Sequence, residues 1–588
     1  MGVMPRSKTA SAGPEKMKKT LWKRDFLALL LAVVMALEVR TCDSRSTEKK
    51  LPHILLIVAD DFGWHNAGFH SSGPKVSEEV HTPNMNQMVK DGLELDRFYS
   101  YKICSPSRSS LQTGRIAQHV NVENVGPESF NPEDTMSGFA GIPRNMTGMA
   151  TRLLEAGYRT HMVGKWDVGM ATFEHTPRGR GYETSRFYFH HANDYWTYGL
   201  PLASTGEINV CMNLFTDFTN DEKPGKDFRT SPATYEEEWF LERSLDIIGN
   251  HNTSEPLFLS HMFHIVHTPL QVPEEYEERF DFIDYKNRRT YAAMVAYMDD
   301  VVGSLRTALE VRNMWDDTLV FFLSDNGGPI YTPGSANNYP LRGGKYSDWE
   351  GGNRVNAFVS GGWVPQNRRG KVISDYIHVA DVYATFLGVA GLDSFDKLAD
   401  LAGLPPVDGI DQSKVLLGEA TGLRKEIHLS ETALIQGPYK LVMGDQPMTA
   451  WTGPYYPNAT GKQPGFFPPG FQFTGCRDGC LFNIWEDPTE HQEISATNSS
   501  VFDAMKKRLA ELNKDNFNPH RGKGNIKACI QAIRNGGFYG PFLTATDLEH
   551  PHTVGRVFED PEDADAHLKF LSMIRKHHAT ASGVFAEM

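Results

Sequence analysis

The chain has 588 residues, of which 40% are hydrophobic and 22% charged, and this composition excludes disordered and collagen-like chains. Lys and Arg number 59 against 73 Asp and Glu, and the net charge of −14 argues against a general binder of nucleic acid or of anionic membranes. An anionic substrate would therefore need a local cluster of cations.

The N-terminus resembles a secretory signal. A basic stretch ending at Lys23 and Arg24 precedes an apolar run from Phe26 to Leu37. This run is shorter than the ~20 residues that a membrane-spanning helix needs, so we expect no stable membrane span, with an uncleaved signal anchor as the alternative. Four Asn-x-Ser/Thr sequons support the secretory route, and they begin at Asn145, Asn252, Asn458 and Asn498.

The six cysteines are too few for a disulfide scaffold and too scattered for a zinc site. Cys42 lies near the leader, and Cys104 belongs to a longer motif. The other four could form two disulfides in any of three connectivities, and they are Cys211, Cys476, Cys480 and Cys529.

Strand and helix patterns alternate along most of the chain, which predicts an α/β fold with a large, mostly parallel central sheet flanked by helices. Short apolar runs predict four buried strands, at His53–Ala59, Tyr158–Val163, Pro256–Met262 and Thr318–Leu323. Apolar residues between Met294 and Leu309 recur at helical spacing and predict a helix packed on the sheet.

The predicted domain organisation follows changes in composition. Residues 1–50 form a leader and linker, and residues 51–425 form the large α/β domain. After about residue 425 the apolar runs shorten and are broken by Gly, Pro and aromatic residues, as in the stretch from Tyr455 to Phe473. This predicts a smaller C-terminal α+β domain with an antiparallel sheet over residues 426–545. A His-rich tail, with a possible terminal helix, follows over residues 546–588.

Two of the predicted strands end in polar clusters, and ligands of open α/β sheets bind beyond the carboxyl ends of strands. The first strand runs into Asp60 and Asp61, and the strand from Thr318 runs into Ser324, Asp325 and Asn326. Adjacent carboxylates repel each other unless a cation lies between them. Hard oxygen ligands favour calcium or magnesium over zinc. The alternative is a pair of unrelated Asx-rich turns.

A longer motif favours the metal site over the turns. Residues 104–115 read CSPSRSSLQTGR, a C-x-P-x-R signature with an L-x-T-G-R extension. This motif resembles the sulfatase family, in which the cysteine is oxidised to formylglycine. The alternative without a catalytic role is a buried structural cysteine that precedes a helix. Further resemblance lies in residues 267–276 (HTPLQVPEEY), 340–352 (PLRGGKYSDWEGG) and 481–490 (LFNIWEDPTE), and it is closest to the arylsulfatase B branch.

The resemblance implies one calcium ion per chain and a nucleophile made from Cys104. The metal ligands would be Asp60, Asp61, Asp325 and Asn326, together with an oxygen of converted Cys104. The hydrated aldehyde has two hydroxyls: one attacks sulfur, and deprotonation of the other expels sulfate and regenerates the carbonyl. Residue 104 is also expected to begin a helix that runs to Gly114, whose N-terminus favours an anion.

The resemblance also supplies the local cations. It places Lys165 and Lys345 on the sulfate oxygens and Arg108 on the converted residue. His267 would hydrogen-bond the bridging oxygen and, with Lys345, protonate the leaving alcohol. Taken alone, each lysine would be read as a solvated surface charge.

The sequence departs from the family pattern at Asp167. The family reads Gly-Lys-Trp-His-Leu-Gly, whereas residues 164–169 read GKWDVG. The missing histidine normally contacts a hydroxyl of the formylglycine hydrate and takes a proton during sulfate release. Asp167 could be the base at lower working pH, His190 or His191 could supply an imidazole in space, or turnover could be impaired. The position of a histidine in the sequence does not show which groups its ring contacts. We therefore favour ordinary surface or core positions, without a catalytic role, for His190 and His191.

The sequence therefore predicts a calcium-dependent, formylglycine-dependent sulfatase that acts on a sulfated small molecule or glycan. We expect it in the secretory pathway, a lysosome-like compartment or outside the cell, matured by the formylglycine-generating enzyme. One alternative is a phosphodiester or phosphonate ester hydrolase on the same scaffold. Another is a catalytically weak sulfoglycan-binding protein, motivated by Asp167 alone.

Overall fold

The computed structural model describes residues 50–71, 78–199, 211, 216–217, 219–220, 223–224, 234–331, 335–454 and 474–551. The predicted leader, Cys42, the Asn458 sequon, the stretch from Tyr455 to Phe473 and the tail from residue 552 lie outside the described residues. Residues from Pro52 onward belong to one compact unit. A division near residue 425 stays a prediction. Among the described helices, none is both long and apolar enough to cross a membrane.

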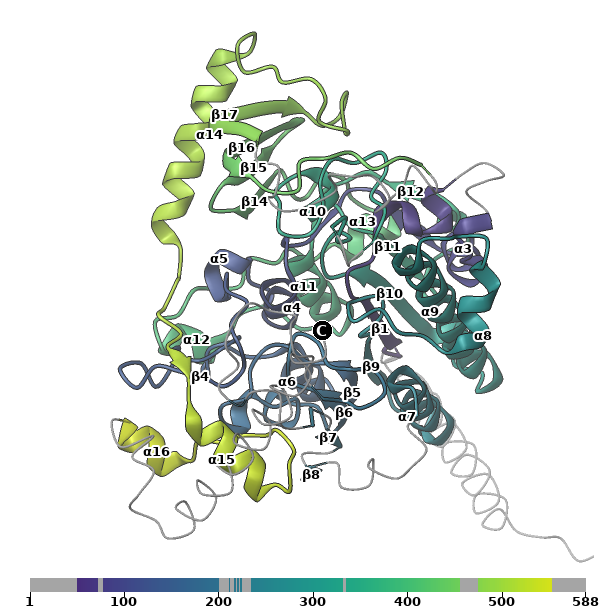
Figure 1. Ribbon diagram of the computed structural model, residues 1–588, viewed down its shortest axis with the longest axis vertical. Helices are drawn as coiled ribbons and strands as arrows, with labels where there is room; N and C mark the ends of the chain where they lie inside the picture. The colour runs from purple at the N-terminus through teal and green to yellow at the C-terminus, as the bar shows by residue number, and fades with distance from the viewer. Residues whose placement is uncertain are drawn as a thin grey trace, which may run out of the picture. The chain divides into compact units, whose positions relative to one another are not determined.

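The central sheet has ten strands in the order β12-β2-β11-β10-β1-β9-β5-β6-β7-β8. Its five middle strands, β10 to β6 in that order, run parallel. The bounds in sheet order are Lys371–Ile373, Leu93–Leu95, Ala357–Ser360, Thr318–Ser324, His53–Ala59, Leu257–Met262, Arg159–Lys165, Thr184–Tyr188, Thr219–Asn220 and Lys223–Pro224. The four predicted strands are therefore confirmed and lie side by side (Figure 1).

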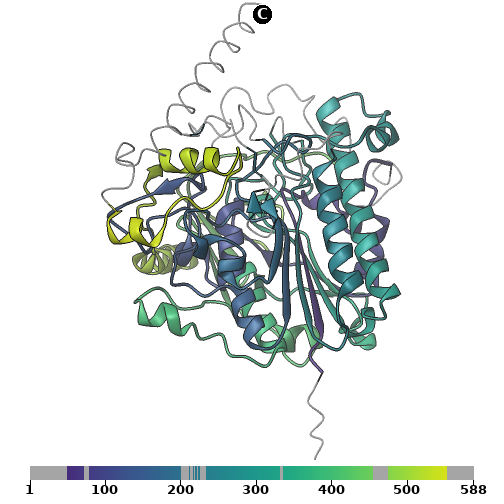
Figure 2. The same cartoon turned by 90° about the horizontal axis from the view of Figure 1, so that it is seen from below.

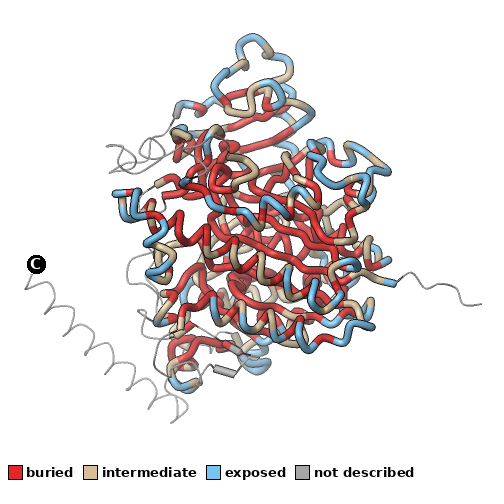
Figure 3. The backbone as a smooth tube through the Cα atoms, turned by 90° about the vertical axis from the view of Figure 1, so that its right-hand side faces the viewer, coloured by how far each residue is buried: buried red, intermediate tan, exposed pale blue. Residues whose placement is uncertain are grey.

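Helices cover both faces of this sheet, because its middle strands are apolar on both sides. One face packs on α7 (Glu236–Asn250) and α9 (Lys286–Val311) through alternate residues such as Leu55 and Ile57. On the other face, Phe386 of α11 (Val379–Val389) contacts Phe258 and Phe321, and α11 packs on α4 (Cys104–Thr113). Figure 2 shows the strands between these helix layers, and Figure 3 shows the buried backbone in the interior with the exposed segments at the periphery.

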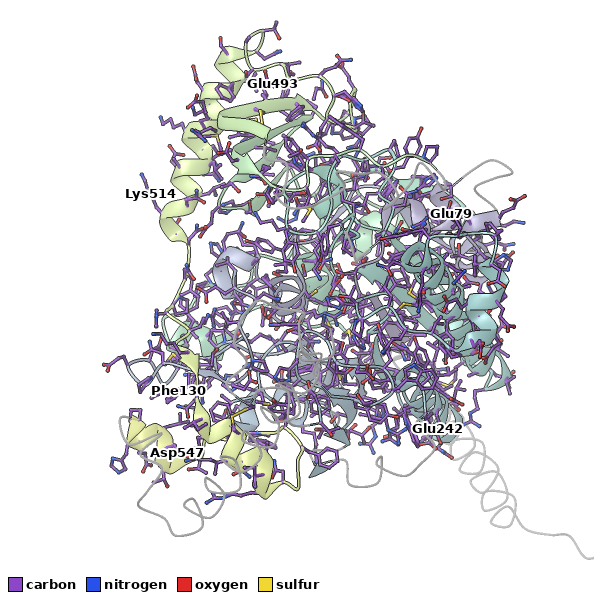
Figure 4. All side chains as sticks on the ribbon, viewed as in Figure 1. Glu79, Phe130, Glu242, Glu493, Lys514 and Asp547 are labelled. Carbon is purple, nitrogen blue, oxygen red and sulfur yellow. A yellow bond between two sulfur atoms is a disulfide. The ribbon has the colours of Figure 1, made fainter. Side chains whose placement is uncertain are left out.

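A smaller antiparallel sheet contains β14 (Glu426–Ser430), β15 (Ala433–Gln436), β16 (Tyr439–Gln446) and β17 (Thr474–Asn483). One face packs on α14 (Ser499–Leu512) through Leu441, Met505 and Leu509. The Glu493 carboxylate accepts a hydrogen bond from the Leu481 amide (2.9 Å) beside this sheet (Figure 4). The opposite face forms a shared core with Tyr99 and Trp349. These two sheets confirm the predicted fold class.

The remaining described helices and strands are short connections. The helices are α3 (Pro83–Lys90), α5 (Ala117–Val120), α6 (Met149–Glu155), α8 (Glu274–Glu277), α10 (Glu350–Asn353), α12 (Lys397–Leu401), α13 (Ser413–Leu417), α15 (Ile526–Arg534) and α16 (Ala545–Glu549). The strands are β3 (Phe98–Tyr99), β4 (Ser129–Phe130), β13 (Ile377–His378) and β18 (Lys523–Gly524).

A buried charge cluster ties the second sheet to the segment after Lys345. Lys440 on β16 lies 2.9 Å from carboxylate oxygens of both Glu350 and Glu490. All three side chains are buried. The cluster therefore helps to fix the backbone that carries Lys345, five residues before Glu350.

Two disulfides decide among the three possible pairings of the four cysteines. Cys211 pairs with Cys529 across 318 residues, and Cys476 pairs with Cys480 within β17. Cys104 is free and buried. The motif cysteine is thus kept out of the structural disulfides.

Candidate active site

The polar residues predicted after the strands meet at one edge of the sheet. Asp60 and Asp61 follow β1, Lys165 ends β5, and Asp325 follows β10. His267 lies five residues after β9. These strands are parallel and adjacent, so their carboxyl ends deliver the side chains to the same place.

Local backbone features bring the strand ends close together. Gly164 precedes Lys165 and has φ +102°, and a Cβ there would overlap the Met262 carbonyl of β9. Glycine is therefore needed where β5 passes this close to the backbone of β9. Asp61 has φ +59°, a region where Asp is among the better tolerated residues.

Cys104 begins α4 beside Asp60, as the sequence predicts. Its Sγ lies 3.4 Å from Asp60 Oδ1, and the other carboxylate oxygen accepts from Lys165 Nζ at 2.6 Å. Burial and the Asp60 charge raise the pKa of the Cys104 thiol well above its usual range. The unmodified cysteine is thus a protonated thiol and a poor nucleophile.

Arg108 lies one turn along α4 and faces the same cluster. Its Nε donates to Asp325 Oδ2 at 2.9 Å, and its NH2 lies 3.7 Å from Asp60. Burial and the Asp60 charge raise the pKa of Asp325 to about 6, against the opposing effect of Arg108. The buried carboxylates therefore repel one another even with these cations present.

Three predicted site residues surround Asp61. Lys345 Nζ lies 2.8 Å from Asp61 Oδ1, and Asn326 Nδ2 donates to the same oxygen at 2.7 Å. His267 Nε2 lies 3.5 Å from Asp61 Oδ2. Because His267 Nδ1 is 2.6 Å from the Thr268 carbonyl, Nδ1 carries the proton in the neutral ring.

The oxygen-rich donor set suits a hard metal ion. Single donor atoms of Asp60, Asp61, Cys104 and His267 all lie within 4.8 Å of one another. His267 belongs to this group, whereas the sequence assigned it to the leaving group, and the Asp325 carboxylate lies outside it. Asn326 Oδ1 is buried without a hydrogen-bond partner, as an unfilled ligand oxygen would be. The oxygen donors of Asp60, Asp61, Asp325 and Asn326 therefore fit calcium or magnesium, whereas the Cys104 thiol and the His267 ring nitrogen do not.

Asp167 is buried next to Lys165, and its partner is His191. His191 Nδ1 lies 2.7 Å from Asp167 Oδ1, and Lys165 Nζ lies 3.7 Å from Oδ2. Burial alone would raise the pKa of Asp167, but the His191 and Lys165 charges lower it below its usual value. His190 is also buried, but it lies 2.7 Å from Asp217 and 3.0 Å from Glu128 instead. The structure therefore brings one of the two histidines to Asp167.

Sequence reasoning missed the acidic residues behind the site. Glu236 and Glu237 start α7 in a run of three acidic residues, a pattern typical of an exposed first turn, yet both are buried. Glu237 accepts from the amides of His264 and Ile265 at 2.8 Å each. The Ile265 carbonyl accepts a hydrogen bond from the Asp60 amide. Glu237 therefore supports the backbone next to Asp60, a predicted metal ligand.

Sequence comparisons agree with the motif. The family model described as Sulfatase matches residues 52–392. Arylsulfatase J of Mus musculus is 28% identical over 512 residues, which cover 84% of this chain and 80% of that protein. N-acetylgalactosamine-6-sulfatase of Rattus norvegicus is 25% identical over 538 residues, 86% of this chain and 93% of that protein.

Solved structures share the fold. Ps i-CgsB has a TM-score of 0.63 and 24% identity, covering 85% of this chain and 99% of that one. The PsFucS1 sulfatase from Pseudoalteromonas sp. has a TM-score of 0.60 and 20% identity, covering 86% and 96%. At these identities the likeness supports the fold alone.

Proposed function

We propose that this chain, which belongs to the sulfatase family and is a sulfuric ester hydrolase, removes sulfate from a sulfated carbohydrate with calcium and a formylglycine made from Cys104. The observation that carries the proposal is the surrounding of Cys104. Three buried cations, Arg108, Lys165 and Lys345, face the same small cluster of carboxylates beside it. Such a site suits an anionic ester despite the acidic net charge.

Each basic residue has a role that its contacts support. Lys165 and Lys345 would hold sulfate oxygens, and Arg108, whose NH1 donates to the Lys165 carbonyl, would orient residue 104 from the next turn of α4. Burial opposes charge on Lys345, but the Asp61 charge raises its pKa well above its usual range, so it carries a proton. Lys345 is therefore the donor for the leaving alcohol, and His267 joins it only when both ring nitrogens are protonated.

Asp60, Asp61, Asp325 and Asn326 would hold calcium. The bound ion would lower the pKa of the attacking hydroxyl and neutralise sulfate oxygens. The unpartnered Asn326 Oδ1 supports a cation here, as do burial and the Asp60 charge, which raise the pKa of Asp325. Lys165 and Lys345 already contact Asp60 and Asp61, so these lysines also offset part of the carboxylate charge.

Formylglycine supplies two hydroxyls on one carbon when hydrated, which an unmodified thiol cannot do. The buried, protonated thiol of Cys104 supports the need for this conversion. The partner during maturation would be the formylglycine-generating enzyme.

The named relatives and the disulfides bear on the substrate class and the location. The relatives named N-acetylgalactosamine-6-sulfatase support a sulfated sugar as substrate. Two disulfides support passage through an oxidising compartment, and we infer the secretory pathway with a lysosome-like or extracellular destination.

Mass spectrometry of the tryptic peptide from Ile103 to Arg108 tests the mechanism. The protein is secreted from cells that carry the formylglycine-generating enzyme, with Cys104→Ala as the inactive control. We expect the aldehyde at residue 104, together with turnover of an aryl sulfate in preference to the matched aryl phosphate. A thiol at residue 104 in an active protein would disprove the mechanism, and preference for phosphate would disprove the reaction.

A further inference from the structure

Asp167 and His191 meet because of the strand pairing of β5 and β6. Lys165 and Tyr188 are register partners at the ends of these parallel strands. The Trp166 amide then donates to the Tyr188 carbonyl at 3.0 Å, which keeps the two exiting chains side by side. Asp167 and His191 each follow within three residues of this pair, so their contact is built into the sheet.

The Asp167 carboxylate has two distinct sides. Oδ1 lies 2.7 Å from His191 Nδ1, whereas Oδ2 is buried without a hydrogen bond and faces Lys165 Nζ at 3.7 Å. Lys165 Nζ in turn contacts Asp60, whose other oxygen lies 3.4 Å from Cys104 Sγ. Oδ2 therefore accepts no hydrogen bond and lies beside Lys165, which also contacts the carboxylate next to Cys104.

The backbone holds this orientation. Asp167 has φ +54°, which few residue types adopt readily and which Asp tolerates. Trp166, its neighbour, is buried and donates from its ring nitrogen to the His175 carbonyl at 2.7 Å. A buried carboxylate oxygen without a hydrogen bond costs free energy, so Oδ2 calls for an explanation, and its neighbour Lys165 belongs to the cluster around Cys104.

We propose that Asp167 Oδ2 is the proton acceptor for sulfate release and that His191 is a positioning residue, which holds Oδ1 through its Nδ1–H. This inference rests on the proposed function and names a base where the family histidine is absent. In the release step, Oδ2 takes the proton of the residue 104 hydroxyl that does not carry sulfate. The O–H electron pair forms the carbonyl, and the C–O bond to sulfate breaks with its pair leaving on sulfate.

The charged groups around the pair favour an ionised Asp167. Lys165 and Arg108 face it from β5 and α4, and His191 faces it from the chain after β6. Glu128 also faces His191, and it holds His190 together with Asp217. His190 is thus engaged elsewhere and does not compete as the base.

Three variants with residue 104 in the aldehyde form test the assignment. In Asp167→Asn, which tolerates positive φ, kcat should fall at least ~100-fold, the lower end for loss of a general base. Intact-mass spectrometry during turnover should show this variant heavier by one SO3 group, because release is blocked after transfer. His191→Gln keeps an N–H donor and should stay near the wild-type kcat, whereas His191→Phe should lose activity mostly at low pH.

His161→Gln is the matched control. It removes a ring that lies 2.8 Å from the Thr184 hydroxyl at the other end of the same strand pair, so kcat should be unchanged. Thermal melting of every variant separates folding from chemistry. Asp167→Asn with the wild-type kcat, or inactive without the sulfated adduct, would overturn the inference alone. A wild-type protein that turns over no sulfate ester would overturn the proposed function and the inference together.

Discussion

Replacing Asp167 by His restores the family residue and should move the acidic limb of the pH–rate profile. In the wild type, the His191 and Lys165 charges hold the pKa of Asp167 below its ordinary value, so the base stays ionised at acidic pH. A histidine has an ordinary pKa of ~6.5 against ~3.9 for Asp, so the limb should rise by about two to three pH units. A base is active when deprotonated, and a lower pKa therefore extends activity to lower pH.

The size of the effect at one pH follows from these values. At pH ~5 a histidine of pKa ~6.5 is about 3% deprotonated, whereas an Asp of pKa below ~3.9 is over ~90% ionised. Asp167→His should therefore lose about 30-fold in kcat at pH ~5 and little near pH ~7.5. Burial and the nearby cations would lower the pKa of the new ring, so 30-fold is an upper value.

The assay is kcat against pH on an aryl sulfate, with enzyme of equal aldehyde content at residue 104. His is tolerated at the positive φ of position 167, and melting temperatures check that the variant folds. An acidic limb that coincides with that of the wild type would refute the role given to Asp167.

Three further predictions test the rest of the site. Chelation of divalent metal should abolish turnover, and calcium should restore it; full activity in chelator would contradict the metal assignment to Asp60 and Asp61. Lys345→Ala should lower kcat ~100-fold or more on alkyl sulfates but less on sulfates of acidic phenols, which need no proton donor; equal losses on both would argue against Lys345 as the acid. Lys440→Met removes the cation that lies between two buried carboxylates and should lower the free energy of unfolding by about 3–5 kcal/mol at neutral pH, measured by urea titration. The loss should shrink at acidic pH, because burial and the Glu350 charge raise the pKa of Glu490 to about 7 and protonation relieves the repulsion; a loss independent of pH would count against this reading.

The prediction of the fold was good where it depended on local patterns. The run His53–Ala59 is β1 without change, and α4 begins at Cys104 and is followed by Gly114 at φ +69°. These features follow from apolar content, strand length and glycine conformation, which are properties of short segments. The site residues at strand ends came together because parallel neighbours deliver their ends to one edge.

The prediction was weaker where charge composition was the only guide. Glu236 and Glu237 resemble an exposed acidic turn, yet both are buried, Glu236 against the His264 ring and Glu237 against the backbone amides of His264 and Ile265. Nothing in the residue types of a short acidic run shows which protein groups will face it. His267 likewise begins a recognisable motif, but its distance of 3.5 Å from Asp61 could be seen only in the tertiary structure.

By itself the sequence determined the α/β class, the sulfatase resemblance of residues 104–115 and the departure at Asp167, because each is written in consecutive residues. Only the tertiary structure decided that His191 rather than His190 reaches Asp167, and that Cys211 pairs with Cys529. The physical reason is distance: hydrogen bonds and disulfides act over a few ångströms, and which residues come that close depends on how strands and loops far apart in the chain are packed.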